Sequence, residues 1–151
     1  MEIRRTVVLP GPASTVFELV DDLARYPEWM DLIHDVGTPV LTSDGLPAWE
    51  VELRAKVGPF ARSKRLRMVR TEHDTPSRVV FERAEIDGRE HSAWVLQSLL
   101  EPCDADSVEL VMTLSYSGSL WTGAVLERVL DDHVERGAAA LAALLATGDN
   151  T

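Results

Sequence analysis

The chain has 151 residues and a net charge of −10, which allows one domain with a sizeable core and argues against nucleic acid or anionic membrane as a bulk partner. No apolar run approaches the roughly 20 residues that span a bilayer, and the first residues lack the apolar core of a signal peptide. Cys103 is the only cysteine, so no internal disulfide can form and we expect a cytoplasmic protein.

The first part of the chain predicts a strand followed by two short helices. Residues 2–9 are rich in β-branched side chains and predict a strand. Residues 13–24 carry apolar side chains at helical spacing. Pro27 breaks this helix and opens a second helical turn over residues 28–33.

From residue 36 the apolar period changes to two, which predicts six further strands over residues 36–42, 49–57, 62–73, 78–86, 89–100 and 108–116. Residues 49–57 give the clearest alternation, with Trp49 and Leu53 on the apolar face. Short turns join these strands, so we expect an antiparallel sheet. The pattern leaves the register of 62–73 and 78–86 open, and with it the direction of Arg70 and Arg83.

The last element is predicted to be one long helix over residues 119–147. Apolar and small side chains recur at three- and four-residue spacing, and the opposite face is charged. A helix of roughly 40 Å needs a broad surface to bury such a stripe. The sequence therefore predicts an α+β fold in which a seven-stranded curved antiparallel sheet wraps around this helix, as a single domain over residues 1–151.

Pro12 to Asp22 and the following Tyr26-Pro27-Glu28-Trp29, in this order of elements, resemble the helix-grip superfamily. The chain is most similar to its bacterial polyketide cyclase/dehydrase-like (SRPBCC) branch; other branches are START-like lipid-transfer domains and birch-pollen-allergen-like proteins. The resemblance implies a cavity between sheet and helix that holds an apolar or amphipathic small molecule. It implies no metal or nucleotide cofactor.

We expect the inward faces of the strands and the buried helix stripe to line that cavity. Trp29 and Trp121 lie near element ends and are predicted to rim its entrance. For each apolar position, plain core packing is the alternative to ligand contact. The predicted ligand-binding residues are Trp29, Trp49, Val51, Leu53, Trp94, Leu96, Ser98, Leu110, Met112, Leu114, Tyr116, Trp121, Val129 and His133.

Few residues in the sequence are candidates for a catalytic role. His133 is the one titratable group on the buried helix stripe, where it could bind a ligand or act as a general base; Tyr116 and His91 are the next candidates. An inward arginine would suit a carboxylate or phenolate. The four histidines are scattered and no metal site is predicted; no phosphate loop or nucleophile motif is present.

A basic stretch runs through two neighbouring strands, with no acidic residue between Leu53 and Thr71. It is either a solvated outer face or a docking face for an acidic protein or an anionic headgroup. The stretch contains Arg54, Lys56, Arg62, Lys64, Arg65, Arg67 and Arg70.

Three functions remain open from the sequence. The first is a carrier of a hydrophobic small molecule, acting as a monomer or weak homodimer, and the apolar inner faces favour it. The second is a cyclase, aromatase or dehydrase-type enzyme. The third is a protein-interaction module with a filled core. Two or more titratable side chains converging in the cavity would favour the enzyme over the carrier.

Overall fold

The computed structural model of the chain describes residues 1–57, 59–117 and 124–148. Within them lie eight strands, two α-helices and one 3₁₀ helix. In chain order these are β1 (Glu2–Pro10), α1 (Ala13–Val20), η1 (Leu23–Glu28), β2 (Ile33–Val36), β3 (Val40–Leu41), β4 (Pro47–Val57), β5 (Phe60–Asp74), β6 (Arg78–Arg83), β7 (Trp94–Asp104), β8 (Ser107–Tyr116) and α2 (Ala124–Gly148).

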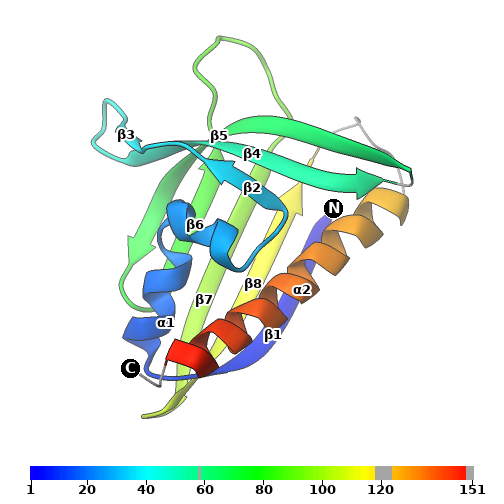
Figure 1. Cartoon of the computed structure of the whole chain (residues 1–151). Coiled ribbons are helices and arrows are strands. Elements are labelled where there is room, and N and C mark those ends of the chain that lie inside the picture. Colours follow the sequence, from blue (N-terminus) through cyan, green and yellow to red (C-terminus); the bar gives the residue numbers. More distant parts are fainter. Residues whose placement is uncertain (58, 118–123, 149–151) are drawn as a thin grey trace.

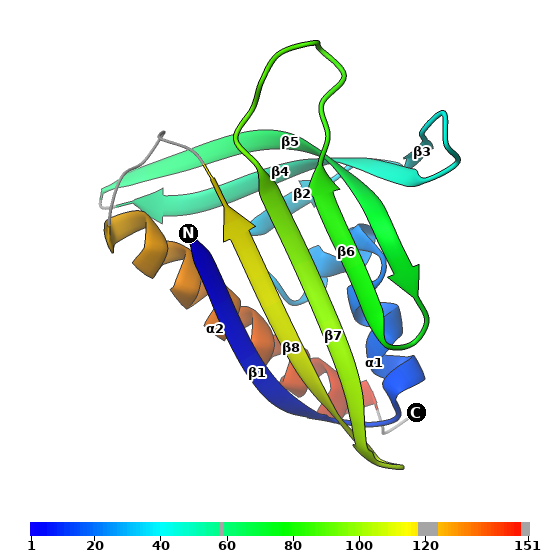
Figure 2. The same cartoon turned by 180° about the vertical axis from the view of Figure 1, so that it is seen from behind.

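The strands form one antiparallel sheet in the order β1-β8-β7-β6-β5-β4-β2, and the two-residue β3 pairs with β4. The first strand thus lies beside the last one (Figure 2). The sheet curves around α2, which runs alongside β1, while α1 and η1 lie near one end of the sheet (Figure 1). The predicted fold, a curved antiparallel sheet of seven main strands closing on a long C-terminal helix, is confirmed.

Alternating burial along the strands defines the inner face. On β8, Val108, Leu110 and Met112 are at most 1% exposed, whereas their sequence neighbours are only half-buried. β7 and β4 repeat this pattern, and the pairing aligns the apolar faces, as in Leu96 opposite Leu114. Each such side chain stabilises the fold by about 1.5–3 kcal/mol relative to exposure, so a one-residue slip of register would be strongly disfavoured.

Several predicted boundaries were wrong for local reasons. The strand expected over 36–42 divides into β2 and β3, because Gly37 and Pro39 interrupt it and proline has no N–H for the sheet. The strands expected over 78–86 and 89–100 stop at Arg83 and start at Trp94. Residues 84–93 form a loop between them, in which Gly88 has a φ of +73°.

The short helices also differ from the prediction. η1 begins at Leu23 because the Asp22 carboxylate accepts a hydrogen bond from the Ala24 N–H at 2.9 Å. Pro27 therefore lies inside η1 rather than opening a later turn, and Ile33 belongs to β2. For α2, the expected start at Ser119 lies outside the described residues. Among the described helices, none is long and apolar enough to cross a membrane.

Candidate ligand-binding site between the sheet and the C-terminal helix

An apolar cavity of about 30 Å³ lies between the inner face of the sheet and α2. That volume holds no more than one or two water molecules, so side chains fill most of the space between sheet and helix. Side chains from η1, the segment after it, five strands and α2 form the wall, and none is ionisable. The lining residues are Leu23, Met30, Leu32, Ile33, Val51, Leu53, Leu66, Met68, Trp94, Leu96, Leu114 and Val134.

Trp94, one of the lining residues, carries a buried polar group. Its side chain is buried beside the Tyr116 ring, with ring centroids 4.6 Å apart. The indole Nε1–H has no hydrogen-bond partner among the described residues, and the same holds for Trp49. A buried donor without an acceptor costs about 1–3 kcal/mol.

A larger cleft of about 420 Å³ adjoins the cavity. No residue that the structure describes lines both, but the same segments contribute to each: Asp31 lines the cleft while its neighbours Met30 and Leu32 line the cavity, and His133 stands in the same relation to Val134. The polar cleft and the apolar cavity are thus built from neighbouring residues of the same elements. The residues that line the cleft are Asp31, His34, Arg54, Ala55, Lys56, Ala61, Val129, Asp132, His133 and Arg136.

An ion pair across the cleft joins α2 to the segment after η1. His133 Nδ1 lies 2.6 Å from Asp31 Oδ1, and Arg136 Nη2 lies 3.3 Å from Asp31 Oδ2. A carboxylate only accepts hydrogen bonds, so Nδ1 carries a proton and donates a hydrogen bond to Asp31, while Arg136 Nη2 lies 3.1 Å from the same nitrogen as a second donor. This arrangement leaves Nε2 as the His133 nitrogen available to a molecule in the cleft.

The ion pair changes the acidity of Asp31. Partial burial by itself would raise its pKa, but the hydrogen bond from His133 and the charges of His133 and Arg136 outweigh burial, so the pKa of Asp31 lies below its ordinary value. Asp31 is therefore ionised near neutral pH. It holds the orientation of the His133 ring, whose side chain is only 9% exposed.

The register question is settled by the pairing of β5 with its neighbours. Arg70 and Arg83 lie opposite Phe81 and Met68, so both point to the inner face. Neither is free for a ligand. Arg70 donates to the Asp21 carbonyl at 2.8 Å and lies 5.9 Å from the centre of the Trp49 ring.

Arg83 is the centre of a buried polar network that holds the 84–93 loop. Its side chain is 6% exposed and pairs with Glu85 at 3.2 Å. Its Nη1 donates to the Ser92 carbonyl, and its Nη2 approaches His91 Nδ1 at 3.3 Å. His91 Nε2 in turn contacts Asp87 at 2.8 Å. The structure thus places His91 on the loop, away from the cavity and cleft walls.

The remaining predicted residues fall into four groups. Val51, Leu53, Trp94, Leu96 and Leu114 line the cavity, while Val129 and His133 line the cleft. Trp49, Ser98, Leu110, Met112 and Tyr116 are buried on the inner face outside the cavity lining. Trp29 does not rim an entrance: it is buried, and its indole donates to the Leu19 carbonyl at 3.0 Å. Trp121 lies outside the described residues.

The pairing of β4 with β5 corrects the expectation of one basic face. Arg62, Lys64 and Arg70 share the inner face, because they pair with or alternate beside inward residues of β4. The outer face receives Arg54, Lys56, Arg65 and Arg67. There Glu52 lies 3.4 Å from Arg54 and 3.9 Å from Arg65.

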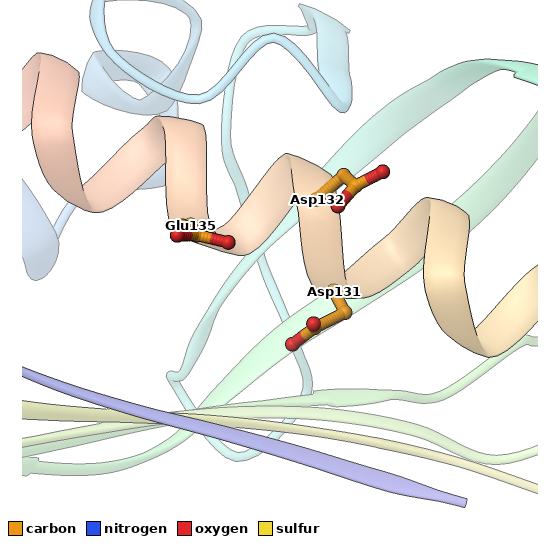
Figure 3. A group of neighbouring side chains, drawn as sticks. All are labelled: Asp131, Asp132 and Glu135. Carbon is orange, nitrogen blue, oxygen red and sulfur yellow. The ribbon is translucent and has the colours of Figure 1, made fainter.

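Three carboxylates gather on α2 beside β1: Asp131, Asp132 and Glu135 (Figure 3). Their ligand atoms lie within 4.8 Å of one another. Arg5 of β1 lies 2.6 Å from Asp131 and 3.9 Å from Glu135. The cluster is explained by this ion-pair link between β1 and α2.

Sequence patterns missed much of the site. Asp31 follows the irregular η1 segment, where no periodicity assigns a direction to a side chain. Arg136 was not among the predicted site residues, yet it lines the cleft, because it lies three residues after His133 and so on the same side of α2. The cavity residues Met30, Leu32 and Ile33 were also missed, because they lie in or directly after the same irregular segment.

A curved antiparallel sheet closed on a long C-terminal helix, with a cavity between them, defines the helix-grip class of α+β domains. The chain belongs to the family described as polyketide cyclase / dehydrase and lipid transport, whose model matches residues 1–146. No curated protein matches the sequence.

Solved structures share this fold. A START superfamily protein from Mycobacterium smegmatis superposes with a TM-score of 0.74 at 18% identity, covering 97% of each chain. The Zhui aromatase/cyclase from Streptomyces sp. R1128 gives 0.70 at 15% identity, covering 97% of this chain and 93% of that one. A protein from Thermobifida fusca gives 0.64 at 26% identity, covering 93% and 90%.

Proposed function

We propose that the protein binds a hydrophobic or amphipathic small molecule, such as a lipid, polyketide or quinone-like compound, and acts as its carrier in the cytoplasm. The apolar part of the ligand enters between sheet and α2, and its polar part lies in the cleft. The observation that carries the proposal is a cavity between sheet and α2 whose wall contains no ionisable group, with a polar cleft formed by neighbouring residues of the same elements. Family membership supports it.

Ligand entry requires the cavity to expand, because ligand sites of this kind occupy about 300–1,000 Å³. Met30 and Met68 lie in the wall, and methionine adopts alternative rotamers at low cost.

An enzyme of the cyclase or dehydrase type is the second candidate. One observation favours it: the Asp31–His133 pair leaves a His nitrogen of defined orientation beside the cavity, which is the arrangement of a general base. The carrier is preferred because the cavity wall itself contains no titratable group.

The small cavity volume favours the third candidate, a protein-interaction module with a filled core. Native mass spectrometry of the protein purified from its own host separates it from the first two. A carrier or enzyme travels with a stoichiometric small molecule of several hundred daltons or takes one up when offered. A bare chain that takes up no lipid, polyketide or quinone would contradict ligand binding.

A further inference from the structure

The β4–β5 wall of the cleft carries only positive charge. Arg54 and Lys56 line the cleft from β4. On β5, Arg62 lies opposite Ala55 and Lys64 lies opposite Leu53, so these two cations lie on the inner face of the sheet. Arg54 and Lys56 alternate to the other face and border the cleft beyond Leu53, the last β4 residue paired with β2. No acidic residue occurs between Leu53 and Thr71, although the whole chain has a net charge of −10.

The acidic groups of the cleft come from the other elements around it. Asp31 follows η1 and is already engaged by His133 and Arg136. Asp132 of α2 is exposed and belongs to the carboxylate cluster beside Arg5. His34 of β2 lies 3.8 Å from Glu52. Neither acid of the cleft forms a salt bridge with the β4–β5 wall among the described residues.

The cations of this wall are weakly compensated. Lys56, Arg62 and Lys64 form no salt bridge with a described residue, and Arg54 meets Glu52 at 3.4 Å. Burial, and then the positive charge of Arg83, lower the pKa of Lys64. A negative charge placed here would relieve repulsion among the cations while the rest of the cleft stays intact.

We propose that the cleft binds the anionic head group, a carboxylate or a phosphate, of an amphipathic ligand, with Arg54 and Lys56 as the counter-charges. The inference rests on the proposed function, because it assumes that the ligand's chain enters the cavity. It adds the charge of the ligand, which the apolar cavity alone does not determine.

Calorimetric titration with three probes of equal chain length tests it: decanoate, decyl phosphate and decan-1-ol, at pH 7.5. We expect at least one of the two anions to bind about tenfold more tightly than the alcohol, and 0.5 M salt to remove most of that preference. Comparing the two anions distinguishes a carboxylate site from a phosphate site.

Variants locate the site. Arg54→Gln and Lys56→Gln should each weaken binding of the preferred anion about two- to fivefold, the range for half-exposed charge pairs, and leave decan-1-ol binding unchanged. Both positions are exposed, so folding should persist, as circular dichroism would verify. Arg128→Gln, on an exposed part of α2 outside the cleft, is the matched control and should change nothing.

The outcomes separate the two proposals. Equal binding of alcohol and anions overturns the head-group site but leaves the carrier function standing. A preference for an anion that survives in the Arg54→Gln/Lys56→Gln double variant places the charge recognition elsewhere and also overturns the inference. Binding of none of the three probes contradicts the proposed function itself.

Discussion

At the scale of single residues, Asp31 connects parts of the candidate site that lie far apart in the sequence. It bridges α2 and the segment after η1 through His133 and Arg136, residues more than 100 positions away in the sequence. Its backbone neighbours Met30 and Leu32 line the cavity. The ion pair therefore ties α2 to the segment whose residues line the cavity.

Replacing Asp31 by Asn removes the charge and keeps the shape. We expect the free energy of unfolding at pH 7 to fall by about 1 kcal/mol, because the carboxylate is largely exposed while its histidine partner is buried. Urea unfolding measures it. Asp132→Asn, an exposed carboxylate on the same cleft, should change stability by less than about 0.5 kcal/mol.

The interaction of Asp31 with His133 and Arg136 also predicts that the free energy of unfolding depends on pH. The pKa of Asp31 is lower in the folded chain than its ordinary value, so its contribution is complete above the unfolded-state pKa of about 4 and is lost as pH falls through the lower folded value. Unfolding curves of the wild type and Asp31→Asn should therefore draw together as the pH falls below about 4. A difference that stays constant from pH 7 to pH 3 would show that the charge is not what stabilises the bridge.

Residue-level prediction from sequence worked where periodicity assigns a direction and failed elsewhere. The inward positions of β4, β7 and β8 follow from a period of two, and the structure buries them. His133 follows from the helix stripe. Asp31 could not be predicted because it follows the irregular η1 segment, and the role of Arg83 could not because its partners lie on the irregular loop 84–93.

At the scale of elements, the 84–93 loop is held by Arg83 rather than by strand pairing. Arg83→Met leaves Glu85 without its buried partner and frees the loop, so it should cost about 3 kcal/mol. Chemical denaturation measures the loss, and hydrogen exchange in residues 84–93 should rise. The double variant Arg83→Met/Glu85→Met should recover a large part of the loss. Stability of Arg83→Met within 0.5 kcal/mol of wild type would contradict the network.

Gly137 explains how closely α2 approaches its neighbour. A Cβ at this position would lie 3.2 Å from Met30 Cε, so the close neighbour of the helix here is the segment after η1. Gly137→Ala gains up to about 1 kcal/mol of helix propensity and loses part of it by displacing the flexible Met30 end.

We therefore expect a net stabilisation of less than about 0.5 kcal/mol for Gly137→Ala, measured by thermal unfolding. The Gly137→Ala/Met30→Ala double variant should show the full propensity gain relative to Met30→Ala, because the obstructing methyl is gone. A gain no larger in the Met30→Ala background than in the wild type would contradict this role of Met30.

At the scale of the molecule, the fold was predictable because its determinants are repetitive. Seven alternating segments, short turns and one long amphipathic helix leave few arrangements that bury every apolar face. The volume of the apolar cavity was not predictable from sequence, since it depends on how individual side-chain rotamers fill the space between sheet and helix. The sheet and α2 are thus specified by pattern, and the cavity by packing.

The central claim is that this space opens to admit an apolar chain. Methyl NMR spectra of the protein titrated with decan-1-ol test it most directly, through intermolecular contacts between the probe and protein methyl groups. We predict contacts with Ile33, Leu96 and Val134 in the cavity wall, and none with the exposed Val40 and Leu41. Contacts confined to the exposed methyls, or no contacts at saturating probe, would contradict the claim.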